Sequence, residues 1–311
     1  MNVDNLWSEK YRPKTIDELV VSENDKKIIN NFISKDEIPN LLFYGNAGTG
    51  KTSTGKILIS SLDAEDLFLN CAEVGIDDVR NTITTFSKTK SFNGKKKIVF
   101  LDEIDSASPA AQRGLRNTME ENSAYCRYIL TSNYIHNVIV PLQSRCQTIQ
   151  LTPPIELIVK RIKYILSNEN IKMENDSINK LIFLIKKYFP DIRKTINEIQ
   201  KYCINGILSI PDLSNVDSFV KKIIDYTIND RMFDLRKIII QNEHDFKGDY
   251  YVLMKNIFDQ MCDTKMQEIE EIKKRLMLIE IGEYMYRSSF VADQEINFYC
   301  LLLTLNKIIK G

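Results

Sequence analysis

Neither sign of charge is in excess in this sequence. Lys and Arg together number 42 and so do Asp and Glu, which gives the 311 residues a formal net charge of zero at pH 7. Such a chain has no overall field that would draw it to nucleic acid or to an anionic membrane, so contact with a polyanion must depend on a local arrangement of charge. The sequence also has no uninterrupted apolar run long enough to cross a bilayer, and we expect no membrane association.

Residues that bind metals or form disulfides are also few. The six cysteines are widely separated and contain no C-x-x-C pair, and the two histidines, His136 and His244, stand alone. We therefore expect neither a structural metal site nor a disulfide framework. The first five residues are polar and lack the basic and apolar pattern of a secretory signal, so we expect a reducing, cytoplasmic location.

The sequence does contain a glycine-rich loop between an apolar run and a helical pattern. The loop consists of Gly45, Asn46, Ala47, Gly48, Thr49, Gly50, Lys51 and Thr52, and continues into Ser53. Residues 41–44 before it are predicted to form a buried strand and residues 53–62 a helix, which is the context that a phosphate-binding loop requires. Glycines let backbone amides turn toward a polyphosphate, Lys51 would reach the outer phosphates, and the Thr52 hydroxyl would bind Mg²⁺. We interpret the loop as a nucleoside triphosphate site rather than a chance glycine-rich turn.

Polar residues follow two other predicted strands. Asp102 and Glu103 come directly after the apolar run 98–101. Hydrolysis of a triphosphate needs such a pair, because Asp102 can hold the Mg²⁺ shell while Glu103 orients and polarises the attacking water. Asn133 follows the predicted strand 128–131, and ligands of open parallel sheets sit at the carboxyl ends of the strands. Its amide could hydrogen-bond the γ-phosphate or the water; in isolation it would be an ordinary turn asparagine.

Strands and helices alternate in the first half of the chain. The further predicted elements are strands at 67–70 and 147–151 and helices at 24–33, 77–87 and 109–121. Because Pro13 prevents a helix through that point, an irregular arm is expected before the first strand. Within this arm Tyr11, Arg12 and Pro13 could line the base side of the nucleotide, and a surface loop is the alternative.

The second half of the chain has a helical pattern throughout. Thr152-Pro153-Pro154 breaks the alternation, and apolar residues then recur at three- and four-residue spacing over 155–167, 175–188 and 191–205. Gly206 and Pro211 end this bundle, and further helices are predicted over 216–309. We expect an α/β P-loop domain with a parallel sheet at 1–152, a small helical lid at 153–210 and an all-α domain at 211–311.

Several short motifs occur in a fixed order along the chain. They are Glu9-Lys10-Tyr11-Arg12-Pro13, the loop 45–52, Asp102-Glu103-Ile104-Asp105, Thr131-Ser132-Asn133, Ser144-Arg145-Cys146 and Pro190-Asp191-Ile192-Arg193-Lys194-Thr195. This order resembles that of AAA+ clamp-loader subunits, a group that includes the replication factor C small subunits and the large clamp-loader subunit of T-even-type bacteriophages. The resemblance covers nearly the whole chain, and Ser-Arg-Cys at this place is a specific mark of clamp loaders within the AAA+ class.

The resemblance implies roles for three further residues. Arg145 resembles an arginine finger, which reaches the nucleotide of the neighbouring subunit and makes hydrolysis conditional on assembly. Arg193, at the start of a lid helix, resembles the second sensor of the γ-phosphate; without the resemblance we would interpret Arg193 and Lys194 as a solvated helix face. Asn70 matches the position from which some AAA+ proteins restrain the catalytic glutamate.

Contact with DNA is also implied by the resemblance, because two of the predicted helices match those that face DNA in clamp loaders. With the overall charge balanced, binding must rely on a few cations that follow backbone phosphates, so it would be independent of sequence and sensitive to salt. The candidates are Arg80, Lys88, Arg113 and Arg116. Gln112 lies four residues before Arg116, so the two are expected to share a helix face.

The resemblance implies an ATPase subunit of a DNA polymerase sliding-clamp loader. Copies of the chain would form a ring, a pentamer completed by at least one different subunit, with ATP and Mg²⁺ at the interfaces. ATP binding would open and hold the sliding clamp, and hydrolysis triggered by primer–template DNA would release it. If the source is a phage, the location would be the host cytoplasm.

Two alternatives are weighed against this interpretation. An AAA+ motor for branch migration or helicase loading shares the nucleotide motifs, but is disfavoured by Ser144-Arg145-Cys146 and by the lack of a recognisable winged helix after the lid. A non-hydrolysing scaffold subunit of the loader would have no physical need for Lys51, Thr52, Asp102 and Glu103 together.

Overall fold

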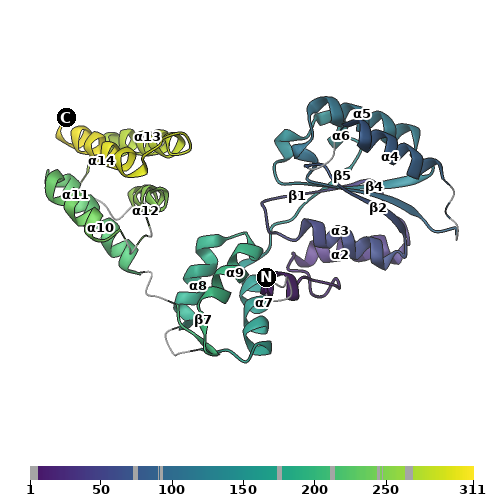
Figure 1. Ribbon diagram of the computed structural model, residues 1–311, viewed down its shortest axis with the longest axis horizontal. Coiled ribbons are helices and arrows are strands. Elements are labelled where there is room, and N and C mark those ends of the chain that lie inside the picture. The colour runs from purple at the N-terminus through teal and green to yellow at the C-terminus, as the bar shows by residue number, and fades with distance from the viewer. Residues whose placement is uncertain are drawn as a thin grey trace. The chain divides into compact units, whose positions relative to one another are not determined.

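The computed structural model describes residues 6–72, 76–89, 91, 94–173, 177–210, 214–243, 246, 248–262 and 269–311. The chain forms two compact units, Met1–Ile210 and Pro211–Gly311. The first unit contains a central sheet with flanking helices, and the second is built from helices (Figure 1).

A parallel sheet forms the centre of the first unit. Its strands are β1 (Leu41–Tyr44), β2 (Glu65–Asn70), β3 (Lys97–Asp102), β4 (Cys126–Ser132) and β5 (Gln147–Gln150). Within the described residues they lie in the order β2-β3-β4-β1-β5, and each neighbouring pair is parallel. The carboxyl ends of all these strands therefore meet at one edge of the sheet, where parallel sheets bind their ligands. The predicted α/β fold with a parallel sheet is confirmed.

Helices cover both faces of this sheet. The helices α2 (Glu23–Ser34) and α3 (Lys51–Ser61) lie on one face, and α4 (Ile76–Lys88), α5 (Pro109–Glu121) and α6 (Val140–Gln143) lie on the other (Figure 1). Side chains of a strand alternate between the two faces, so Leu41 and Phe43 belong to the core under α2 and α3 while Leu42 belongs to the core under α5 and α6. Burial on both faces explains why the strands are nearly continuous apolar runs.

The lid packs as a helical bundle with a small sheet at one end. Its helices are α7 (Ile155–Asn168), α8 (Ser177–Tyr188) and α9 (Ile192–Lys201), and a second sheet has the order β6 (Lys172–Met173), β8 (Ile207–Leu208), β7 (Cys203–Ile204). The predicted helix over 191–205 is thus too long: it ends at Lys201, and Asn205 and Gly206 turn the chain with positive φ angles of 52° and 78°. The small sheet was not predicted, because two-residue strands leave no alternation to detect.

The irregular arm expected before the first strand contains one helical turn, α1 (Trp7–Lys10). Trp7 is buried and its backbone N–H donates to Gln200 Oε1 at 2.9 Å, which attaches this turn to α9. From Tyr11 to Lys14 the chain is irregular, as Pro13 requires.

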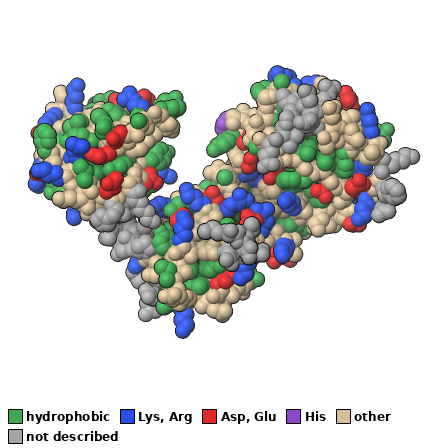
Figure 2. Space-filling view, viewed as in Figure 1, with side chains coloured by type: hydrophobic (Ala, Val, Ile, Leu, Met, Phe, Trp, Pro, Cys, Tyr) green, Lys and Arg blue, Asp and Glu red, His purple; other side chains and the backbone are tan. Residues whose placement is uncertain are grey.

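The second unit is a bundle around one apolar core. It contains α10 (Ser214–Ile228), α11 (Met232–Gln241), α12 (Tyr250–Cys262), α13 (Glu271–Arg287) and α14 (Gln294–Lys310). Not all apolar side chains of this unit are buried, and hydrophobic side chains reach its surface among charged ones (Figure 2). On α13 the exposed residues Ile272, Leu276, Ile279 and Tyr286 recur at three-, four- and seven-residue spacing, which places them along one side of the helix. Across the described ranges of both units, no helix has the length and apolar character to cross a membrane.

Candidate nucleotide site

The glycine-rich loop lies at the carboxyl end of β1 and approaches two other segments closely. Gly45 has φ 141°, and a Cβ there would lie 2.6 Å from the backbone oxygen of Leu151. Gly48 has φ 71°, and a Cβ there would lie 1.9 Å from Asp191 Oδ1 at the start of the lid helix α9. The Ile192 N–H also donates to Gly48 O at 3.2 Å. The positive φ angles and the close neighbours favour glycine at these two positions. The hydrogen bond between Ile192 and Gly48 shows that the loop is in direct contact with the lid.

Lys51 is the first residue of α3, at the end of the loop, and is only 7% exposed. Its Nζ donates to Gly45 O, Asn46 O and Asn133 Oδ1, each at 2.8 Å. Burial lowers the pKa of Lys51 to about 8, although nearby carboxylates, chiefly that of Asp105, act in the opposite direction. The ammonium group thus sits in a pocket of oxygens at the end of the sheet, where phosphate oxygens can replace the loop carbonyls.

Thr52 and Asp102 lie together beside Lys51. Thr52 Oγ1 donates to the two carboxylate oxygens of Asp102 at 2.9 and 3.1 Å. Mg²⁺ prefers oxygen ligands and is usually held in phosphate-transfer enzymes by one or two protein oxygens together with substrate phosphates. The hydroxyl and carboxylate oxygens present here fit that ion.

Glu103 directly follows Asp102 and has an unusual backbone conformation. Its φ is 56°, in the left-handed region that non-glycine residues seldom adopt. The Glu103 N–H donates to Thr131 Oγ1 at 3.0 Å, and Thr131 Oγ1 donates in turn to Asp102 Oδ1 at 2.6 Å. A single threonine hydroxyl on β4 therefore orients both acidic residues, a role that the sequence analysis did not assign.

Asn70 ends β2 in register with Asp102 on β3, one residue from Glu103. Its Oδ1 accepts a hydrogen bond from the Ala72 N–H at 3.1 Å. The pairing of β2 with β3 thus brings Asn70 to the carboxyl edge beside the acidic pair, which is where a residue that restrains Glu103 would have to lie.

Two other polar residues hold the loops around this edge, and neither was assigned a structural role from the sequence. Asp105, in the 3₁₀ turn Ile104–Ser106, accepts hydrogen bonds through Oδ2 from the backbone N–H groups of Asn133 and Tyr134, both at 3.0 Å. Gln112 on α5 is buried, and its amide group donates to Ala107 O and Asn137 O and accepts from Ile139 N. Gln112 and Arg116 are four residues apart on α5, and the Gln112 amide makes its hydrogen bonds inside the protein rather than at the surface of the helix.

A cavity beside the loop brings together residues of the arm, the loop and the lid. The predicted site residues that line it are Tyr11, Arg12, Pro13, Gly48, Thr49, Gly50, Ser53 and Arg193. The rest of the lining consists of the apolar side chains of Leu19, Val20, Ile192 and Ile196 together with Ser8 and Arg161. A mostly apolar cavity next to a phosphate-binding loop has the character needed to bind a nucleobase.

The arm is fixed to the lid through Tyr11. Tyr11 Oη donates to Glu169 Oε1 at 2.6 Å, and Arg161 Nη2 donates to Tyr11 O at 2.9 Å. Burial and the hydrogen bond to Glu169 raise the pKa of Tyr11 to about 12. Lys10 and Tyr11 together lower the pKa of Glu169 through their hydrogen bonds. Glu169 and Arg161 lie on or next to α7, so the position of the arm depends on the lid.

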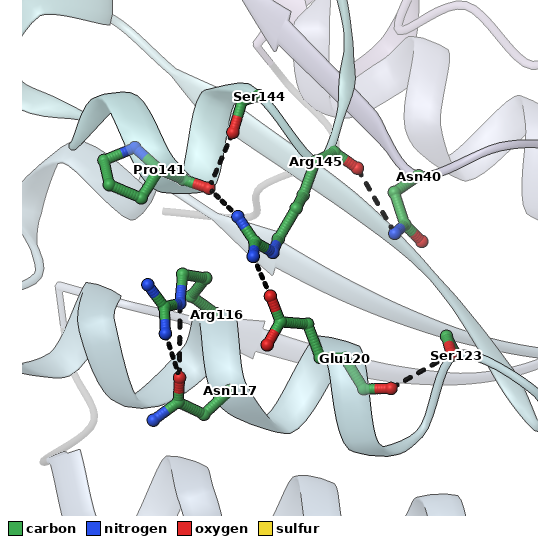
Figure 3. A network of polar contacts seen from close by, with 8 residues as sticks. All are labelled: Asn40, Arg116, Asn117, Glu120, Ser123, Pro141, Ser144 and Arg145. Atoms are coloured by element: carbon green, nitrogen blue, oxygen red, sulfur yellow. Dashed lines mark hydrogen bonds and ion pairs between the residues drawn. The ribbon is translucent and has the colours of Figure 1, made fainter.

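Arg145 lies apart from the residues predicted to bind the nucleotide. Gln147, at the start of β5, pairs with Leu41 at the start of β1, whereas the loop follows Tyr44 at the end of β1. Arg145 is therefore at the amino edge of the sheet, with the roughly 10 Å length of β1 between it and the loop. Its guanidinium forms an ion pair with Glu120 and donates to Pro141 O at 2.8 Å, and the side chain is 33% exposed (Figure 3).

The candidate DNA contacts lie on α4 and α5, which pack against each other. Lys88 and Arg113 are exposed, and Arg116 is half-buried and donates to Asn117 Oδ1 (Figure 3). Arg80 belongs to α4, but its side chain lies outside the described residues. Lys88, Arg113 and Arg116 do not line the nucleotide cavity.

The parallel sheet, the lysine in the glycine-rich loop and the acidic pair on β3 define a P-loop ATPase of the AAA+ class. A family model described as "ATPase family associated with various cellular activities (AAA)" matches residues 41–154, and one described as "Sliding-clamp-loader large subunit, AAA+ ATPase lid domain" matches residues 155–212. The chain belongs to the family of sliding-clamp-loader large subunits and replication factor C small subunits, as the resemblance of its motifs predicted.

Relatives of this family align along most of the chain. The sliding-clamp-loader large subunit of Escherichia phage RB69 is 32% identical over 84% of this chain and 85% of its own length. That of Enterobacteria phage T4 is 30% identical over 97% and 96%, and the replication factor C small subunit of Archaeoglobus fulgidus is 30% identical over 98% of each chain. The solved structure of the Thermotoga maritima RuvB Holliday junction branch migration motor has a TM-score of 0.52 at 17% identity over 94% of this chain and 90% of that one, which shows a shared fold. The chain is thus a nucleotide-binding ATPase.

Proposed function

We propose that this chain is an ATPase subunit of a DNA polymerase sliding-clamp loader, which hydrolyses ATP with Mg²⁺ at the interfaces between subunits. The names of its relatives and the match to a clamp-loader lid support the assembly to which we assign it. The domain limits that we propose are 1–152 for the ATPase domain, 153–210 for the lid and 211–311 for a collar through which subunits associate.

The chemistry at the carboxyl edge of the sheet follows from the hydrogen bonds there. Lys51 exchanges its loop carbonyls for the outer phosphate oxygens of ATP and keeps Asn133 as a neighbour. Thr52 and Asp102 would supply oxygen ligands for Mg²⁺, which would neutralise charge on the outer phosphates. Glu103 orients the attacking water and polarises it.

The nucleotide base and the lid complete this site. The base lies in the cavity next to Tyr11, Arg12 and Pro13, and Arg193 reaches the γ-phosphate from α9. Because Gly48 contacts the first turn of α9, a change in the loop on ATP binding is passed to the lid. Asn70 restrains Glu103 until the ligands have arrived.

The observation that carries the proposal is the position of Arg145. This arginine lies at the amino edge of the sheet, on the surface and away from its own loop, so it cannot serve its own nucleotide without a rearrangement of the sheet. A guanidinium in that position is suited to a phosphate bound by a neighbouring copy, where it offsets charge on the transferred phosphoryl group. Hydrolysis then depends on assembly.

The second unit supplies a surface for that assembly. Ile272 and Ile279 on α13 are 73% and 67% exposed, and Ile296 on α14 is 58% exposed. Large apolar side chains exposed along helices are typical of surfaces that become buried in oligomers. We assign these faces to contacts between collar domains in a ring that is pentameric and contains at least one different subunit.

ATP hydrolysis determines when the loader releases the clamp. ATP-bound subunits have a higher affinity for the open sliding clamp and for primer–template DNA than hydrolysed ones, and this difference in affinity provides the free energy for release. DNA binds through its backbone phosphates to Arg80, Lys88, Arg113 and Arg116, so contact is independent of sequence.

The test is ATP turnover by the purified chain alone, then with its partner subunit, and then with clamp and primer–template DNA. We expect low turnover alone and a rise at each addition, with Lys51→Ala inactive throughout as the control. Full turnover by the dilute, monomeric chain, unchanged by any addition, would contradict the proposal.

A further inference from the structure

We propose that Glu120 is a positioning residue for Arg145, which holds the guanidinium in the orientation that reaches the phosphate of a neighbouring copy. The inference rests on the proposed function of Arg145 as a finger acting between subunits. Glu120 lies in the last turn of α5, and Arg145 follows α6 on the segment that leads into β5. The two side chains point toward each other and form an ion pair through Glu120 Oε1 and Arg145 Nη2 (Figure 3).

The backbone of Arg145 is already fixed to the sheet. Arg145 O accepts a hydrogen bond from Asn40 Nδ2 at 3.4 Å, and Gln147 N donates to Asn40 O at 2.7 Å. Asn40 Oδ1 in turn accepts from Tyr128 N at 3.0 Å at the start of the strand pair β1 and β4. These hydrogen bonds fix the backbone position of Arg145. The guanidinium can therefore move only through rotation about the side-chain torsions.

Glu120 and Pro141 remove most of that rotamer freedom. Arg145 Nη1 donates to Pro141 O at 2.8 Å while Nη2 contacts Glu120, so both terminal nitrogens of the fork have partners from the same chain. A guanidinium carries five N–H donors, and these contacts leave the others available to a ligand. With 33% of the Arg145 side chain exposed, those donors can meet a phosphate that another subunit brings to the surface.

A contribution to folding stability does not explain why Glu120 occupies the last turn of α5. Glu120 lies near the C-terminus of α5, where the helix dipole disfavours a negative charge. Its side chain is 46% exposed, and ion pairs this open to water add little to stability. Arg116, one turn earlier on the same helix, donates to Asn117 Oδ1 instead, which leaves the Glu120 carboxylate to Arg145 (Figure 3). The pair is thus better explained by the orientation of Arg145 than by packing.

The test compares Glu120→Ala and Glu120→Gln with Glu121→Ala in the assembled loader with clamp and primed DNA. Glu121 is the matched control, because it is the next acid on α5, is exposed and forms no ion pair with any residue that the structure describes. We expect Glu120→Ala to lower kcat about tenfold, the size of one lost charge-assisted hydrogen bond, with KM for ATP unchanged. Glu120→Gln, which retains an acceptor oxygen, should recover part of the loss, and Glu121→Ala should match the unchanged chain.

Combining Glu120→Ala with Arg145→Ala separates positioning from a structural role. If Glu120 acts through Arg145, the double variant is no slower than Arg145→Ala alone, whereas structural damage would add to the loss. Normal or raised turnover in Glu120→Ala, with Arg145→Ala strongly impaired, overturns the inference and leaves the proposed function intact. Normal turnover in Arg145→Ala overturns both.

Discussion

The Thr131 hydroxyl lies 2.6 Å from Asp102 Oδ1, and this contact joins β4 to the acidic end of β3. The same hydroxyl accepts a hydrogen bond from the Glu103 N–H at 3.0 Å. The acidic pair is therefore oriented before any nucleotide arrives, and the left-handed backbone of Glu103 is held by a side chain from the neighbouring strand.

Replacing Thr131 should slow ATP hydrolysis without weakening the affinity for ATP. Thr131→Val keeps the shape but removes the hydroxyl, so Asp102 and the Glu103 N–H each lose a partner. We expect turnover in the assembled loader to fall about tenfold, measured beside ATP affinity by equilibrium binding. Thr131→Ser is the control and should retain most of the activity. Turnover in Thr131→Val equal to that of the unchanged chain would remove the hydroxyl from the mechanism.

Glu103→Gln should separate binding from chemistry. The amide cannot accept a proton from the water, so we expect turnover to drop by roughly 10²–10⁴ while the affinity for ATP stays near that of the unchanged chain. Single-turnover measurements with the assembled loader would report both quantities. Glu121→Gln on α5 makes the same change of charge outside the site. Normal turnover in Glu103→Gln would exclude this residue as the group that activates water.

The affinity for ATP should fall as the pH rises through about 8. Burial lowers the pKa of Lys51 to about 8 in the nucleotide-free chain, so its ammonium loses the charge that attracts phosphate above this pH. Bound phosphates favour the charged form and raise the pKa again, so ATP binding takes up a proton in this range and Kd rises by at most about tenfold per pH unit.

Titration of ATP binding between pH 7 and 9.5 measures this effect. Lys51→Arg is the control, because a guanidinium stays charged throughout the range and its affinity, although altered, should not follow the same curve. An affinity of the unchanged chain that is constant over this range would show that Lys51 does not control the pH dependence.

Two arginines on neighbouring helices should determine the response to DNA. If Arg80 on α4 and Arg116 on α5 follow backbone phosphates, changing both to alanine should weaken the stimulation of ATP turnover by primer–template DNA for every sequence. The slope of log affinity against log salt should also become shallower by roughly two. Arg127→Ala, on β4, removes one cation from another surface as a control. Unchanged stimulation in the double variant would discard these positions.

The elements of the first half were predictable because each carries a local signal. The apolar run 41–44 matches β1, and Ser108 followed by Pro109 gives α5 the start that was predicted, since Ser108 caps the helix through a hydrogen bond from Ala111 N. Lys51 and Asp102 were found from motifs with a known spacing. In the second half, residues 202–205 were misassigned to a helix, because a two-residue strand pair has no periodicity of its own, whereas the break at Gly206 was predicted.

The residues that organise the site were not predictable in the same way. Thr131 contacts Asp102 only because β4 lies next to β3, and strand order does not follow from a single sequence. Gln112 resembles a surface residue of an amphipathic helix until its partners at Ala107 and Asn137 are known. The pair Glu120 and Arg145 joins elements that are 25 residues apart, and no spacing rule connects them.

Mixing two inactive variants tests most directly whether Arg145 completes a site on another copy. Lys51→Ala keeps its arginine but loses its own nucleotide site, and Arg145→Ala keeps its site but loses the arginine. The two variants are mixed in equal amounts and assembled with the partner subunit, clamp and primed DNA. If the arginine acts between copies, an intact nucleotide site meets an intact arginine at about a quarter of the interfaces between copies of this chain, and turnover should return there. A mixture as inactive as either variant alone, with assembly verified by its mass in solution, would contradict the account.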